Sequence, residues 1–207
     1  QKGTGTALVS SGRGHRQAFL SSVTVTGNLG ASPLAGGTTG IAAGDAICRN
    51  LAQTAGLYQP QSFKALLADS QHNAFQRFAV DGPWYRLDGR LFAQDIAELG
   101  AMKVTLPLNI TEKGEFVGEG QSHLLGNTIA WTGANTDGSP SGDTCQNWTS
   151  TDVSGRQSIA VNSVGMGEIG FSYWVSEYSD LRNAGNVRLF CLSDADVIFH
   201  DEFETMP

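Results

Sequence analysis

A set of oxygen-bearing side chains in the second half of the chain has the composition of a calcium site: Asn135, Asp137, Asp143, Glu177 and Asp180. Calcium takes roughly six to eight oxygen ligands, several of them from carboxylates, so convergence of these groups would suit the ion. Asn and Asp are also the residues that close turns in loops rich in Gly and Ser. The pattern therefore fits a calcium site and a set of turn caps equally well.

A group of aromatic residues near the same region offers flat faces on which sugar rings stack: Trp148, Tyr173, Trp174 and Tyr178. Their rings make them candidate ligand-binding residues for a carbohydrate. The alternative is that the two tryptophans belong to the hydrophobic core, because a large apolar ring is most often buried.

The stretch from Trp131 to Trp148, WTGANTDGSPSGDTCQNW, contains members of both groups. It begins as a short apolar strand, continues through Gly, Asn, Asp, Ser and Pro, and ends at Cys145 and a second tryptophan. Such a middle section does not form regular structure, whereas tryptophans are usually buried. We therefore predict a long loop that is attached to the core at its two ends.

Other catalytic or ligand-binding patterns are weak. The histidines stand singly, which is typical of solvated or structural roles: His15, His72, His123 and His200. Residues Gly165 to Gly170 match the dinucleotide pattern G-x-G-x-x-G, but a strand-like sequence follows where that site needs a helix. We predict neither a catalytic site nor a cofactor, apart from the calcium alternative.

Charge and composition limit the function further. The chain has 207 residues, only 16% of them charged, with 26 glycines and a net charge of −7. This composition is typical of a globular, loop-rich protein. Its basic residues form no stripe, so nucleic-acid binding is not expected. No apolar run approaches the roughly 18 residues of a membrane span. The carboxylates between Asp194 and Glu204 predict a solvated acidic tail.

The elements that would position these residues are read from hydrophobic periodicity. Apolar residues at helical spacing predict helices over Ile41–Leu57 and Ala93–Ala101. An alternating, β-branched run predicts a strand at Ala18–Thr26, and apolar, strand-like runs predict a buried strand from Phe63 onward and strands at Phe171–Val175 and Val187–Leu192.

Two local features are predicted between the helices. Asp69 and Ser70 could cap a short helix through Phe75 and Phe78. Residues 84–92, WYRLDGRLF, predict a β-hairpin around Asp88-Gly89, the dipeptide that a type I′ turn prefers.

In this order the segments resemble the C-type-lectin-like superfamily. Within it the chain is most similar to the endostatin module of collagens and its uncharacterised bacterial relatives. The resemblance covers residues 19–192 and is carried by GDAICRNLAQTAGL, SFKALLADS, WYRLDGRLFAQDIAEL, AWTGANTDGSPSGDTCQNWTS and VRLFC. It implies an α+β fold with a mixed, mostly antiparallel sheet, two helices and long loops.

The resemblance also implies a disulfide between Cys48 and Cys191, which would indicate an oxidising compartment. The family's second bridge needs a fourth cysteine, but the chain has Arg182–Gly185 at that place. Cys145 is therefore expected to be a buried free thiol beside Trp148, with an intermolecular bridge or a reactive role as alternatives.

Known ligand sites of the resembled proteins do not carry over. His15 lacks the neighbouring histidine of the endostatin zinc site, and the Glu-Pro-Asn and Trp-Asn-Asp motifs of calcium-dependent sugar binding are absent. Scattered arginines and a negative net charge disfavour sulfated polyanions, whereas neutral or weakly charged glycans remain open.

These observations predict one domain over residues 18–192, between a flexible arm (1–17) and an acidic tail (193–207). We expect a secreted or surface-exposed protein that binds a carbohydrate or protein ligand in an adhesion or matrix role. Its face would be built from the loops between Trp131 and Asp180. The alternatives are an extracellular enzyme acting on a polymer through paired carboxylates, such as Asp137, Asp143 or Glu177, and an assembly protein joined through Cys145 or the tail.

Overall fold

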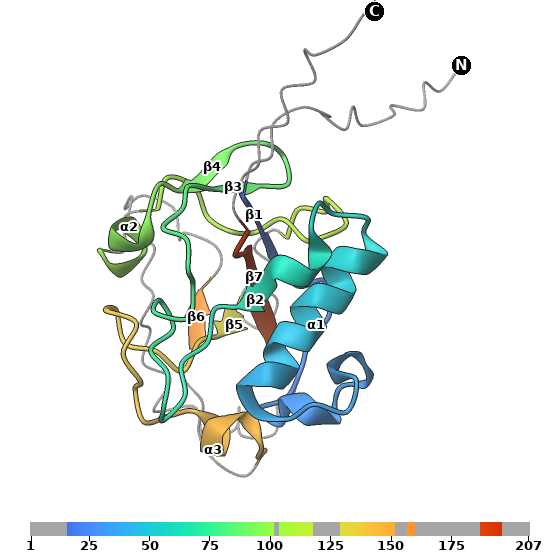
Figure 1. Ribbon diagram of the computed structural model, residues 1–207, viewed down its shortest axis with the longest axis vertical. Coiled ribbons are helices and arrows are strands. Elements are labelled where there is room, and N and C mark those ends of the chain that lie inside the picture. The colour runs from blue at the N-terminus through green and yellow to red at the C-terminus, as the bar shows by residue number, and fades with distance from the viewer. Residues whose placement is uncertain (1–15, 102–103, 118–128, 152–156, 160–186, 196–207) are drawn as a thin grey trace, which may run out of the picture.

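The structure, a computed structural model, describes residues 16–101, 104–117, 129–151, 157–159 and 187–195 (Figure 1). Its strands are β1 (Arg16–Leu20), β2 (Phe63–Ala65), β3 (Trp84–Arg86), β4 (Leu91–Ala93), β5 (Ile129–Trp131), β6 (Gln157–Ile159) and β7 (Arg188–Ser193). Its helices are α1 (Gly40–Thr54), α2 (Ile96–Gly100) and the single turn α3 (Cys145–Trp148), with short 3-10 helices at Leu29–Ala31, Pro33–Ala35 and Pro60–Ser62.

Strand β7 lies at the centre of the sheet. The strands follow the order β4-β3-β1-β7-β5-β6, and β2 also pairs with β7. One edge of β7 is antiparallel to β1. Its other edge is antiparallel to β2 through residues 191–193 and parallel to β5 through residues 188–189. The sheet is therefore mixed and mostly antiparallel, and the predicted α+β class with few helices is confirmed.

The middle of the sheet is buried on both faces, because side chains of β1 and β7 alternate between two hydrophobic clusters. Ala18 and Leu20 join Phe190 in one cluster, whereas Phe19 and Cys191 join the other. The Ala18–Thr26 strand predicted from sequence is shorter in the structure, since β1 ends at Leu20. The predicted closing strand agrees with β7 to within a residue at each end.

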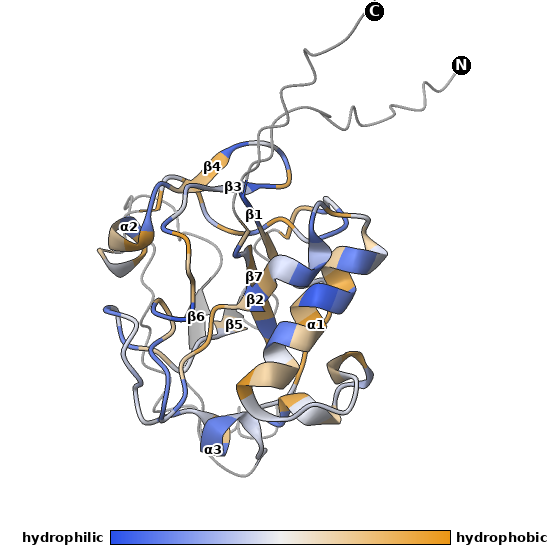
Figure 2. Ribbon diagram, viewed as in Figure 1, coloured by the Kyte–Doolittle hydropathy of each residue, from blue (hydrophilic) through white to orange (hydrophobic). Residues whose placement is uncertain are grey.

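Helix α1 covers the second cluster. Its buried apolar side chains recur at helical spacing, as the sequence predicts: Ala43, Ile47, Cys48, Leu51 and Ala52. Figure 2 shows hydrophilic and hydrophobic stretches along α1, as expected of an amphipathic helix. A Cβ on Gly44 would lie 2.6 Å from Leu67 Cδ1 and 3.2 Å from Ala65 Cβ. A glycine at this position therefore lets the helix approach β2 closely.

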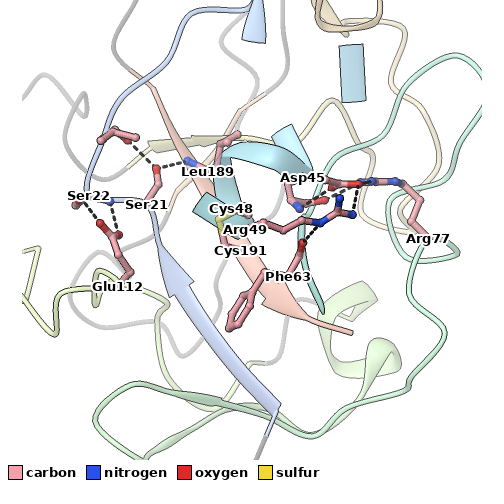
Figure 3. The surroundings of a disulfide bond; sticks show 12 residues. Ser21, Ser22, Asp45, Cys48, Arg49, Phe63, Arg77, Glu112, Leu189 and Cys191 are labelled. Carbon is pink, nitrogen blue, oxygen red and sulfur yellow. Dashed lines mark hydrogen bonds and ion pairs between the residues drawn. A yellow bond between two sulfur atoms is a disulfide. The ribbon is translucent and has the colours of Figure 1, made fainter. Parts of the chain in front are cut away.

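A disulfide joins Cys48 of α1 to Cys191 of β7, the pairing that the resemblance implies (Figure 3). Both cysteines are fully buried. The two residues are 143 positions apart in the chain. The covalent bond therefore fixes the main helix to the central strand.

Polar contacts flank the disulfide on both sides (Figure 3). On one side, the Asp45 carboxylate accepts a hydrogen bond from the Ala65 N–H (3.0 Å) and pairs with Arg77 (2.6 Å). On the other side, the Ser22 N–H donates to the Glu112 carboxylate (2.8 Å). Because these carboxylates are buried and have partners, they connect loops to the core at little desolvation cost.

The predicted hairpin is present as β3 and β4, but its turn type was wrong. Gly89 has a φ of 78°, whereas Asp88 is not in the left-handed region, as a type I′ turn would require. The Gly89 N–H donates to the Arg86 carbonyl (2.9 Å), and the Arg86 N–H donates to Arg90 (2.8 Å). This pattern is a type I turn followed by a left-handed glycine.

The helix predicted after Asp69 and Ser70 was also wrong. Asp69 does use its carboxylate as a cap, but it accepts the N–H groups of Gln71 and His72 (2.9 Å each) and closes a tight turn. The other predicted helices are present, although the second is reduced to α2.

The predicted acidic tail begins too early, because Asp194 belongs to the body. Its carboxylate pairs with Lys64 and accepts the backbone N–H groups of Ala79 (2.7 Å) and Val80 (3.1 Å). Strand β1 likewise starts at Arg16, inside the predicted arm.

Within the described residues, no helix is long and apolar enough to cross a membrane.

We predict that replacing both bridged cysteines, Cys48→Ala with Cys191→Ala, lowers the free energy of unfolding by about 5 kcal/mol, because the bond restricts a very long loop in the unfolded chain. Urea unfolding of the oxidised protein and the variant, compared at equal ionic strength, measures the difference. The wild type under reducing conditions is the matched control and should resemble the variant. A loss below about 1 kcal/mol would contradict the loop-closure account.

Candidate functional site

The stretch from Trp131 to Trp148 is a loop attached to the core at both ends, as its sequence predicts. The Trp131 indole N–H donates to the Val25 carbonyl (3.1 Å), and the Trp148 indole N–H donates to the Ala68 carbonyl (2.8 Å). The two rings pack edge to face, with centroids 5.9 Å apart. Both belong to the cluster beneath α1. The loop therefore leaves and rejoins the same part of the core.

Trp148 is a core residue, which corrects the prediction that its ring binds a ligand. Its exposed fraction is 0%, and its N–H is already bonded, so no sugar ring can stack on it in this fold. The other predicted stacking residues, Tyr173, Trp174 and Tyr178, lie outside the described residues.

The loop ends in a left-handed helical turn, α3. Cys145, Gln146, Asn147 and Trp148 have φ values of 49°, 51°, 57° and 65°. The turn is closed by the Trp148 N–H, which donates to the Thr144 carbonyl (2.7 Å). An L-residue in this conformation costs roughly 1–2 kcal/mol, and none of the four is glycine. The turn is therefore strained, and its surroundings must hold it in place.

Several other segments hold the turn. The Ser70 N–H donates to Asn147 Oδ1 (2.9 Å), and Asn147 Nδ2 donates to Ser70 Oγ (2.9 Å). Gly27 lies against the turn so closely that a Cβ there would be 2.4 Å from the Cys145 sulfur. A Cβ on Gly40, at the start of α1, would be 3.2 Å from the Asn147 carbonyl oxygen. The strain is therefore balanced by specific contacts from three separate parts of the chain.

A second set of contacts joins the same two loops. Asn73 Nδ2 donates to the Asp137 carbonyl (3.2 Å), and the Ala74 N–H donates to the Gly138 carbonyl (2.8 Å). A Cβ on Gly138 would be 2.5 Å from the Phe75 ring. Residues 69–76 and 133–149 thus form one continuous ordered surface, called the loop face below.

Two of the predicted calcium ligands, Asn135 and Asp137, act as turn caps. Asn135 Nδ2 donates to Ser139 Oγ (3.0 Å) and the Pro140 carbonyl (3.1 Å). The Ser139 hydroxyl and N–H both donate to the Asp137 carboxylate, and these bonds hold its pKa below the ordinary value. Asp143 is half-buried near Cys145.

The remaining two predicted ligands, Glu177 and Asp180, lie outside the described residues. Within the part of the chain that the structure describes, no group of three or more His, Cys, Asp or Glu residues could hold a metal ion. Turn capping therefore accounts for Asn135 and Asp137, and calcium binding stays a prediction.

Cys145 is unpaired and buried, as the sequence predicts. Burial raises the pKa of its thiol to about 12, with a further contribution from the nearby Asp143 charge. The thiol form is therefore dominant at every physiological pH, and a thiol is a poor nucleophile. An intermolecular bridge through Cys145 would require α3 to open first.

A carboxylate–imidazole pair at the loop face was not singled out from the sequence. Asp69 Oδ1 lies 2.7 Å from His72 Nδ1 and also accepts two backbone N–H groups. Asp69 is buried, whereas 54% of the His72 side chain is exposed. This contact orients the imidazole through Nδ1. An Asp-x-x-His spacing at a turn is the sequence signal that could have indicated the pair.

No protein-family profile and no curated protein sequence matches the chain.

We predict that Gln146→Gly stabilises the protein by about 1 kcal/mol, because glycine adopts a positive φ without the steric cost. Gln76→Gly is the matched control. It changes another exposed glutamine of the loop face, whose φ is not positive, and should instead destabilise by about 0.5–1 kcal/mol. Urea unfolding measures both changes. Equal destabilisation by the two substitutions would refute the left-handed turn.

We predict that Cys145 in the native protein reacts very slowly with a thiol reagent such as iodoacetamide, and that its rate rises about tenfold per pH unit from pH 7 to pH 10 without levelling off. The reason is that its raised pKa keeps the thiolate scarce throughout this range. Mass spectrometry of the alkylated protein measures the rate, and the guanidinium-unfolded, unreduced chain serves as the fast control. Native labelling that is fast at pH 7 and levels off near the ordinary cysteine pKa of about 8.5 would contradict the burial.

Proposed function

We propose that the protein is an extracellular or cell-surface binding module of the C-type-lectin-like type, and that the loop face forms part of its ligand-binding surface. The resemblance is supported by the mixed α+β sheet and by the bond between Cys48 of the main helix and Cys191 of the closing strand. The placement of the ligand-binding surface at the loop face is supported above all by the left-handed turn α3. A buried disulfide is consistent with an oxidising compartment.

The left-handed turn indicates a functional surface because its conformation costs stability. Strained backbone conformations persist where the surroundings enforce them, and they cluster at ligand-binding and catalytic sites. Here the strain falls on exposed Gln146 and half-buried Asn147, at the junction of two loops. A glycine would serve the fold better at Gln146, so the structure alone does not explain the residue.

The chemistry of the loop face favours a neutral or weakly charged ligand. No Lys or Arg occurs in residues 65–76 or between Lys113 and Arg156. The hydrogen-bonding groups of the loop face include the His72 imidazole and three exposed amides: Gln71, Gln76 and Gln146. Amides can donate to and accept from hydroxyl groups, whereas a polyanion would find no countercharge. A carbohydrate is therefore the first ligand class to test, and a protein is the second.

We predict that the purified protein binds at least one member of an array of uncharged glycans and does not bind heparin. Gln146→Arg should abolish that binding, because a long charged side chain would cover the loop face. Gln53→Arg, on the exposed side near the far end of α1, is the matched control and should bind like the wild type. Binding is expected to survive EDTA, because the side chains of Asn135 and Asp137 are already hydrogen-bonded to Ser139 within their own turn.

Each outcome of the array has a defined meaning. Loss of binding in EDTA would restore the calcium alternative. Binding that Gln146→Arg leaves intact would exclude the loop face as its location. No binding to any glycan, followed by no binding to extracellular proteins on a matched array, would refute the binding function.

A further inference from the structure

Both ends of the described body lie side by side, at the outer end of the β1–β7 pair (Figure 1). Arg16 Nε donates to the Ala195 carbonyl (3.1 Å), and the Gln17 N–H donates to Ser193 Oγ (2.7 Å). In an antiparallel pair the hydrogen bonds run across the strands. A pull on the two ends therefore acts along these bonds and breaks them one after another, starting at the outer end.

This peeling reaches the disulfide almost at once. Phe19 of β1 pairs directly with Cys191 of β7. The Phe19 ring packs on Phe63, with centroids 5.3 Å apart, in the cluster that also contains Cys48. Both bridged cysteines are fully buried. Strand β1 is thus part of the cover over the bond, and tension removes it by breaking its pairing with β7 on one edge and with β3 on the other.

We propose that the Cys48–Cys191 bond is a tension-exposed redox site. At rest the fold hides the bond, and tension through the two ends strips β1 away and opens it to small-molecule thiols. Attack by a thiolate on one sulfur forms a mixed disulfide and releases the other cysteine as a thiolate. A second thiol then attacks the mixed disulfide, frees the remaining cysteine and leaves as an oxidised thiol pair. This inference is independent of any ligand that the loop face binds.

The bond also decides which residues carry tension. While it is intact, the covalent path between the two ends runs through the cysteines, so the backbone of residues 49–190 carries no load once the strands have separated. The whole loop face lies in that unloaded segment. Once the bond is reduced, the 143-residue separation between the cysteines becomes available and adds about 500 Å of extended chain. The redox state therefore determines whether tension reaches the loop face.

The test holds the full chain between handles at its two ends under constant force, with glutathione in solution. We expect an extension step of about 500 Å, which appears only at loads that peel β1 and occurs more often as glutathione increases. A Cys145→Ala background excludes exchange with the third thiol. Reduction at the same rate without load, measured by mass spectrometry, would overturn the proposal. So would the absence of the step under load.

A substitution in the cover provides the matched comparison. Phe19→Ala thins the cover, so the step should appear at lower load than in the wild type. Tyr58→Ala removes an exposed aromatic ring that is not part of the β1–β7 pair, so it should leave the required load unchanged. Equal loads for Phe19→Ala and the wild type would show that β1 does not protect the bond. If Phe19→Ala does not fold, the wild-type dependence on load still decides the proposal.

Discussion

The fold depends on the central position of β7. One edge of this strand receives β1, the other receives β2 and β5 in succession, and its Cys191 is bonded to α1. Both faces of the strand are buried, so that five of its six residues are shielded from solvent. Strands β3 and β6 join the sheet through β1 and β5, which are direct neighbours of β7. The loops that form the candidate site are attached to this centre by Trp131, at the end of β5, and by the Ala68 carbonyl just beyond β2.

The helix α1 and the strand β7 were predictable from sequence, because burial of one side of an element fixes the spacing of its apolar residues. The apolar spacing in α1, the apolar run in β7 and the Asp-Gly dipeptide of the hairpin all predict the correct type of element. The attachment of the long loop by Trp131 and Trp148 was predictable for a similar reason, since large apolar rings seek the core. The disulfide pairing, in contrast, came from the resemblance and not from spacing.

The candidate site was less predictable because its conformation depends on contacts between distant segments. The sequence CQNW contains no glycine, so nothing local indicates a left-handed turn. The turn forms because Ser70, Gly27 and Gly40, all far away in sequence, meet it. Trp148 was misjudged as a ligand residue, since an aromatic ring suits a core and a binding face equally well. Asp69 was correctly seen as a cap, but a turn and a helix start use the same carboxylate bonds.

The close packing of glycines beneath the loop face has a consequence for the thermodynamics of association. At Gly27, Gly133 and Gly138 an added carbon would collide with neighbouring atoms at 2.4–2.6 Å, so backbone and side chains already fill the space under the loops. Loops with no room beneath them have little conformational entropy left to lose when a partner arrives. Docking would then resemble a rigid-body encounter, in which only a small backbone ordering cost opposes the hydrogen bonds that a partner makes.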